Sequence, residues 1–154
     1  METAIKDFDV VESPRKPGCV IVYFDLLCRG QKTGVKVMSE SVFAQYWLDE
    51  VARYFLVLQN STWEDTNYEF YLLSKDFKVL DYLSLLSPPD RDDELIDGYE
   101  LKDGVFFFKK YGNGNRYKVV IENKGKVGYS FGDLKYRLIL GALKPVKYLQ
   151  LTPL

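Results

Sequence analysis

The chain has no histidine among its 154 residues, which removes the commonest general base and the commonest metal ligand of proteins together. Zinc sites need clusters of cysteine or histidine, and the chain has only two cysteines. It also lacks a Walker loop, a dinucleotide-binding fingerprint and a nucleophile elbow. The GNGN stretch at residues 112–115 predicts a hairpin turn, because no helix pattern follows it. We therefore expect a protein that is not an enzyme and has no cofactor and no metal.

Long apolar runs are missing as well. The longest, residues 19–28, holds Asp25 and is far shorter than the roughly twenty residues of a membrane-spanning helix. Residues 1–12 are charged and lack the apolar centre of a secretory signal. We interpret residues 18–28 as one buried strand, in which Cys19 and Cys28 would lie roughly 30 Å apart, too far for a disulfide. We therefore expect two free thiols, no membrane association and a location in the reducing cytoplasm.

Hydrophobic periodicity predicts a helix and then a run of strands. Apolar side chains recur at three- and four-residue spacing over residues 42–55, which is typical of one face of an amphipathic helix. Ser39 or Ser41 can cap its N-terminus. From residue 56 to residue 86 the period changes to two, which predicts a three-stranded meander.

The remaining segments complete the predicted fold. Residues 35–38 are expected to pair with the strand before them, and residues 146–151 indicate a final strand. Residues 131–145 fit either a short helix or a strand. The predicted class is α+β: a single domain over residues 1–154, in which a mainly antiparallel, twisted sheet packs against one main amphipathic helix.

Charge is distributed unevenly along the chain. Residues 1–101 carry 10 Lys and Arg against 19 Asp and Glu, which gives −9, whereas residues 102–154 carry 11 against 3, which gives +8. Such asymmetry is a reason to look for a charged partner. The alternative is that the two halves pack together and neutralise each other.

The segment from Phe106 to Val120 is predicted to be a hairpin with Asn113-Gly114 as its turn. In that register Lys109 faces Lys118, and like charges directly opposite each other are unfavourable in a sheet. A second turn at residues 124–125 would add another strand. One face of the sheet would then gather Phe107, Lys109, Tyr111, Arg116, Lys118, Tyr129 and Phe131.

This basic, aromatic face has two interpretations. Aromatic rings interleaved with cations are suited to single-stranded nucleic acid, because rings stack on bases and cations hold phosphates. Alternatively, the rings pack under the helix while the Lys and Arg stems extend to the rim.

Carboxylates form a second group in two predicted loops. Its members are Glu64, Asp65, Asp90, Asp92, Asp93, Glu94 and Asp97. If the loops meet at one end of the sheet, they form a negative patch that can hold a basic partner. The alternative is that both loops are simply solvated.

Residues 43–86 resemble immunity proteins of bacterial contact-dependent growth inhibition and related polymorphic toxin systems. Gln45, Trp47 and Arg53 carry the helical part of the likeness, and the strand part lies around Asn67 to Tyr71. The resemblance implies a cytoplasmic protein that binds and neutralises a cognate toxin, often a nuclease. No toxin-binding residue is transferred by it. Our first hypothesis is such an inhibitor, and the alternative is a protein that binds single-stranded nucleic acid.

Overall fold

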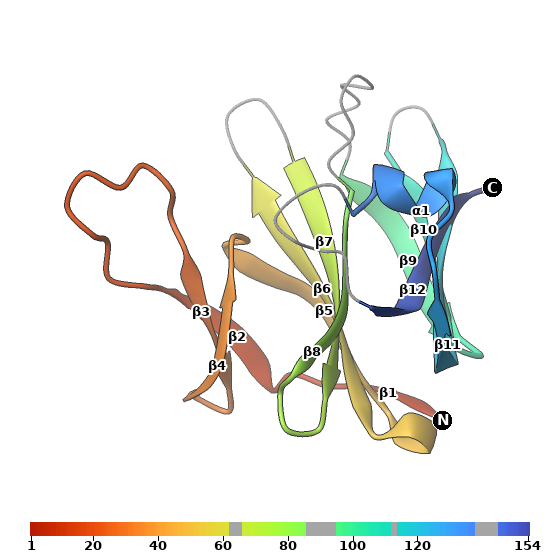
Figure 1. Cartoon of the computed structure of the whole chain (residues 1–154), viewed down its shortest axis with the longest axis horizontal. Helices are drawn as coiled ribbons and strands as arrows, with labels where there is room; N and C mark the ends of the chain where they lie inside the picture. Colours follow the sequence, from red (N-terminus) through yellow and green to blue (C-terminus); the bar gives the residue numbers. More distant parts are fainter. Residues whose placement is uncertain (62–65, 86–94, 112–113, 138–144) are drawn as a thin grey trace.

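The regular structure of the described residues is nearly all antiparallel β, arranged in three sheets. A computed structural model describes residues 1–61, 66–85, 95–111, 114–137 and 145–154 (Figure 1). The five-stranded sheet has the order β1 (Glu2–Ala4), β5 (Ser41–Leu48), β6 (Arg53–Ser61), β7 (Thr66–Ser74) and β8 (Val79–Ser84). The four-stranded sheet has the order β12 (Val146–Pro153), β11 (Arg116–Val127), β10 (Val105–Lys110) and β9 (Ile96–Lys102). The three-stranded sheet has the order β2 (Phe8–Glu12), β3 (Phe24–Cys28) and β4 (Gln31–Val37).

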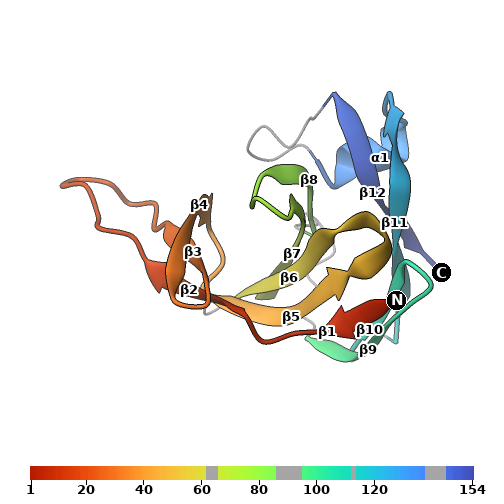
Figure 2. The ribbon, with the colours of Figure 1, turned by 90° about the horizontal axis from the view of Figure 1, so that it is seen from below.

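The five-stranded sheet lies between the other two and is covered on both faces (Figure 2). Along β6, Phe55 and Val57 belong to the core that the sheet shares with the four-stranded sheet. The alternate residues, Leu56 and Leu58, belong to the core shared with the three-stranded sheet. Because both faces are apolar, the central strands are almost continuously hydrophobic and show little polar alternation.

The predicted amphipathic helix over residues 42–55 does not form, so the α+β class is wrong. These residues belong to the β5–β6 hairpin, in which Tyr46 pairs with Phe55 and Trp47 with Tyr54. The chain reverses through a 3₁₀ turn, η1 (Asp49–Val51), and through Ala52 in the left-handed conformation. Apolar residues lie on both faces of these two strands, and together they produce the three- and four-residue spacing from which the helix was predicted. Their aromatic and β-branched side chains favour strands.

Several other predictions are confirmed. Strands β6, β7 and β8 form the expected meander, and β3 pairs with β4 as a hairpin. The last strand forms as β12. Part of the ambiguous segment is a short helix, α1 (Phe131–Lys135), while residues 138–144 lie outside the described residues. No helix in the described part of the chain is long and apolar enough to cross a membrane.

Candidate binding surfaces

The predicted acidic patch falls mostly outside the described residues. Asp97 lies near the start of β9 and is exposed. The other six members of the patch lie outside the described residues: Glu64, Asp65, Asp90, Asp92, Asp93 and Glu94. A negative patch that holds a basic partner therefore stays a prediction.

The hairpin of β10 and β11 forms, but its register differs by two residues from the predicted one. Lys109 lies opposite Arg116, and Lys118 lies opposite Phe107, so the predicted pair of lysines is wrong. The Lys110 N–H donates to the Asn115 carbonyl oxygen at 3.0 Å, which makes the connection longer than a two-residue turn. A shift of two residues keeps each side chain on its expected face. Lys109 therefore still faces a cation.

The predicted second turn at residues 124–125 is also wrong, because β11 continues through these residues to Val127. Strand β12 crosses closely at this point. A Cβ atom on Gly125 would lie only 2.0 Å from Val146 Cγ1 and 2.8 Å from the Tyr148 ring. Glycine is therefore needed here for the close approach of β12, not for a turn.

The basic face is only partly assembled as predicted. Phe107, Lys109, Arg116 and Lys118 do share the outer face of the four-stranded sheet, and we call these four residues the basic sheet face. Behind them, Phe106, Phe108 and Val119 are buried in the core. The three other predicted members lie outside these strands: Tyr111 follows β10, Tyr129 follows β11, and Phe131 begins α1.

The cations of the basic sheet face have free head groups. Lys109, Arg116 and Lys118 form no hydrogen bond or ion pair with any described side chain. Beside them lies a hollow of about 540 Å³ between β9, β10 and β11. Its lining includes Asp97, Gly98, Tyr99, Glu100, Phe107, Lys109 and Arg116. This surface combines the aromatic ring of Phe107 with charges of both signs.

A loop that projects from the three-stranded sheet was missed by the sequence prediction. Residues 14–22 join β2 to β3 and extend away from the rest of the molecule (Figure 1). Val20 is 93% exposed and Ile21 is 48% exposed, although both were predicted to lie in a buried strand. The Ser13 N–H donates to the Tyr23 carbonyl oxygen at 2.9 Å and closes the base of the loop. Two prolines and a glycine in this segment were the available signal.

The two cysteines are both free, as predicted, and they differ in environment. Cys19 is exposed on the projecting loop, and Cys28 is half-buried at the end of β3. Burial raises the pKa of the Cys28 thiol, and the nearby Asp7 carboxylate adds to this effect. A raised pKa lowers the fraction of reactive thiolate at neutral pH.

We expect Ellman's reagent to modify the native protein in two phases, one fast equivalent from Cys19 and one slow equivalent from Cys28. The Cys19→Ser variant should lose only the fast phase. Gels with and without reductant should show the same monomer mobility. Equal rates for the two thiols, or an internal disulfide found by mass spectrometry, would contradict the assignment.

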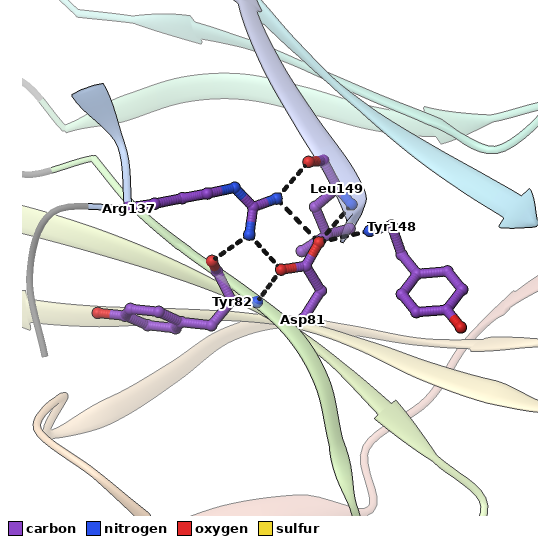
Figure 3. A network of polar contacts seen from close by, with 5 residues as sticks. All are labelled: Asp81, Tyr82, Arg137, Tyr148 and Leu149. Atoms are coloured by element: carbon purple, nitrogen blue, oxygen red, sulfur yellow. Dashed lines mark hydrogen bonds and ion pairs between the residues drawn. The ribbon is translucent and has the colours of Figure 1, made fainter. Parts of the chain in front are cut away.

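A buried ion pair joins the five-stranded sheet to β12 where β8 and β12 meet (Figure 3). The guanidinium of Arg137 donates to both carboxylate oxygens of Asp81 and also to the Leu149 carbonyl oxygen at 2.6 Å. The Asp81 carboxylate accepts from the backbone N–H groups of Tyr148 at 2.6 Å and Leu149 at 2.7 Å. The carboxylate thus takes the place of strand-to-strand hydrogen bonds between the two sheets. This cluster is structural, because it has no access to solvent.

A second buried carboxylate, that of Glu69 on β7, accepts hydrogen bonds from two hydroxyl groups. One belongs to Tyr82 on β8 and the other to Ser39, which lies between β4 and β5. Ser39 Oγ donates to one oxygen at 2.5 Å, and the Tyr82 hydroxyl donates to the other at 2.6 Å. Burial, and to a smaller extent the nearby Glu69 charge, raises the pKa of Tyr82 far above its ordinary value. The same two causes raise the pKa of Tyr71. All four side chains are buried, so they supply no reactive group to a substrate.

The described residues include no group of three or more cysteine, aspartate or glutamate side chains that could hold a metal ion. The comparisons with known proteins are also negative. No protein-family model matches the chain, and no match was found among curated proteins or solved structures. Among the described residues, we take the projecting loop and the basic sheet face as the candidates for function.

Proposed function

We propose that this chain is a non-enzymatic inhibitor of a cognate bacterial toxin, in the first instance a nuclease, and that it inserts the projecting loop into the toxin. The observation that carries the proposal is the exposure of Val20 and Ile21 at a segment that stands away from the body of the protein. The strand part of the resemblance to immunity proteins lies in the meander and supports the class of function. The helical part falls on β5 and the start of β6, where no helix forms, and gives no support.

The loop has the properties of a contact element. Val20 is almost fully exposed and Ile21 is half-exposed, and fully burying one such side chain in a cleft stabilises a complex by roughly 1.5–3 kcal/mol. Arg15 and Lys16 precede the apolar pair, and both are exposed. A projecting loop can enter a concave site that a flat sheet cannot reach. Blocking an active site in this way needs no catalytic group in the inhibitor.

The test is co-expression with a candidate toxin domain from a neighbouring gene, with bacterial growth and toxin activity as readouts. The unmodified protein should restore growth. The Val20→Asp, Ile21→Asp double variant should bind the toxin domain on the order of a hundredfold more weakly or worse, because two buried apolar contacts are replaced by charges.

Val127→Asp is the matched control, because Val127 is 85% exposed at the end of β11, in a different sheet from the loop. This variant should protect as well as the unmodified protein. Both variants should unfold within about 0.5 kcal/mol of the unmodified protein, since exposed substitutions have little effect on stability. Full protection by the loop variant would reject the loop as the inhibitory element, and failure of the unmodified protein to protect would reject the inhibitor function.

A further inference from the structure

We propose that the hollow beside the basic sheet face binds one nucleotide unit of a single-stranded nucleic acid, with Phe107 under the base, Lys109 and Arg116 at the phosphates, and Glu100 at the base edge. This inference is independent of the inhibitor proposal. The four-stranded sheet and the projecting loop lie at opposite ends of the molecule (Figure 1).

Cations line one side of the site in a regular arrangement. Lys109 and Arg116 face each other across β10 and β11, and Lys118 lies two residues further along β11, roughly 7 Å away along the strand. None of the three forms an ion pair with a described carboxylate, although like charges directly opposite each other destabilise a sheet. Free cations that follow a strand suit a ligand with regularly spaced negative groups, which a nucleic acid backbone supplies.

One aromatic ring, that of Phe107, provides a platform next to these cations. Phe107 lies on the outer face between Glu100 on β9 and Lys118 on β11. Tyr99 pairs with Phe108, so its ring lies on the core side of the sheet, where it packs against Phe43 at 5.0 Å and Phe106 at 5.7 Å between centroids. Tyr99 is therefore not part of the platform. The Phe107 ring is half-buried between its strand neighbours, and such a ring can stack on one base without a large loss of side-chain entropy.

An irregularity of β9 opens the hollow. The pairing of β9 with β10 shifts between Phe108 and Lys110, as in a β-bulge. Gly98 lies at this point with a φ of +137°, and no atom lies within 4 Å of where its Cβ would be. Bulges and glycines in strands are found where a ligand approaches the backbone closely. The hollow is therefore open to a ligand beside Gly98, next to Lys109 and Arg116.

The carboxylates in the hollow favour a nucleotide over a simple polyanion as the ligand. Asp97 and Glu100 line the same space, and neither forms a hydrogen bond or ion pair with a described residue. Acidic groups would repel phosphate, but they accept hydrogen bonds from the donors of a base. Guanine offers two adjacent donors, which match the two oxygens of one carboxylate, whereas uracil offers one. Glu100 is the neighbour of Phe107 across the strands, so a base stacked on Phe107 would bring its edge to Glu100.

The experiment is fluorescence anisotropy with two labelled single-stranded RNAs, one of alternating guanine and uracil and one of uracil alone. The unmodified protein should bind both, more weakly as salt is raised, and should prefer the guanine-containing RNA by about fivefold to a hundredfold. Lys109→Glu should reduce binding to both RNAs at least about tenfold and flatten the salt dependence. Its melting temperature should be unchanged or higher, because the new carboxylate faces Arg116.

Glu100→Gln should keep the binding to the uracil RNA and lose the preference for guanine, because an amide has one acceptor oxygen where the carboxylate has two. Lys75→Glu is the matched charge control, since Lys75 is exposed in the turn between β7 and β8. This control should bind both RNAs as the unmodified protein does.

Three outcomes would overturn the inference. They are no salt-sensitive RNA binding by the unmodified protein, equal losses for Lys109→Glu and Lys75→Glu, and a guanine preference that survives Glu100→Gln. If no RNA binds while Lys109→Glu weakens binding to the toxin domain, the face belongs to a protein partner and the inference fails. The loop variant Val20→Asp, Ile21→Asp should bind RNA normally, so failure of the inhibitor proposal is distinguishable from failure here.

Discussion

Replacing Asp81 with alanine should lower the free energy of unfolding by about 3–5 kcal/mol, because the change leaves a buried Arg137 charge without its partner. Both side chains are fully buried. The same change removes the acceptor for the backbone N–H groups of Tyr148 and Leu149, where β12 meets β8. Urea unfolding followed by tryptophan fluorescence measures the loss, and hydrogen exchange should show weaker protection at these two amides.

A double variant separates the ion pair from the packing. In Asp81→Leu, Arg137→Met, neither charge remains, so this protein should be more stable than the Asp81→Ala variant. The interaction energy between the two positions should be large, because the side chains share one hydrogen-bond network. A loss of less than about 1 kcal/mol in Asp81→Ala would show that β12 does not depend on this carboxylate.

Replacing Phe106 with alanine should destabilise the protein by about 3–5 kcal/mol, through lost apolar contact and the cavity that remains. Phe106 has 0% exposure and lies in the core between the five-stranded and four-stranded sheets. Its ring centroid is 5.5 Å from that of Phe55 and 6.2 Å from those of Tyr46 and Phe70. The two sheets therefore depend on this ring for their contact.

Phe107→Ala is the matched control, since the next residue of β10 points to the opposite face. Phe107 is only half-buried, and its loss should cost about 1 kcal/mol or less. Thermal and urea unfolding of the two variants provide the comparison. Equal destabilisation would contradict the assignment of the two faces, and an unfolded Phe107→Ala protein would also remove the basis of the proposed stacking platform.

The meander could be predicted because its strands are long and its turns contain polar residues. The hairpin of β10 and β11 could be predicted for the same reason, including which side chains point outward. Its register could not, because a connection longer than the Asn-Gly dipeptide moves the pairing by two residues. The projecting loop was missed because its apolar residues have the composition of a buried strand.

By itself, the sequence determined the lack of histidine and the alternation of faces along β10. Both cysteines are free as predicted, but Cys19 lies on the projecting loop and not in the strand from which that prediction was made. Only the tertiary structure decided that residues 41–48 are a strand and not a helix, because sheets cover both faces of β5 and β6 and hide the period of two. It also decided which polar residues meet, as with Asp81 and Arg137, which lie 56 residues apart. Local patterns carry no information about such pairs, since the partner is chosen by the packing of distant strands.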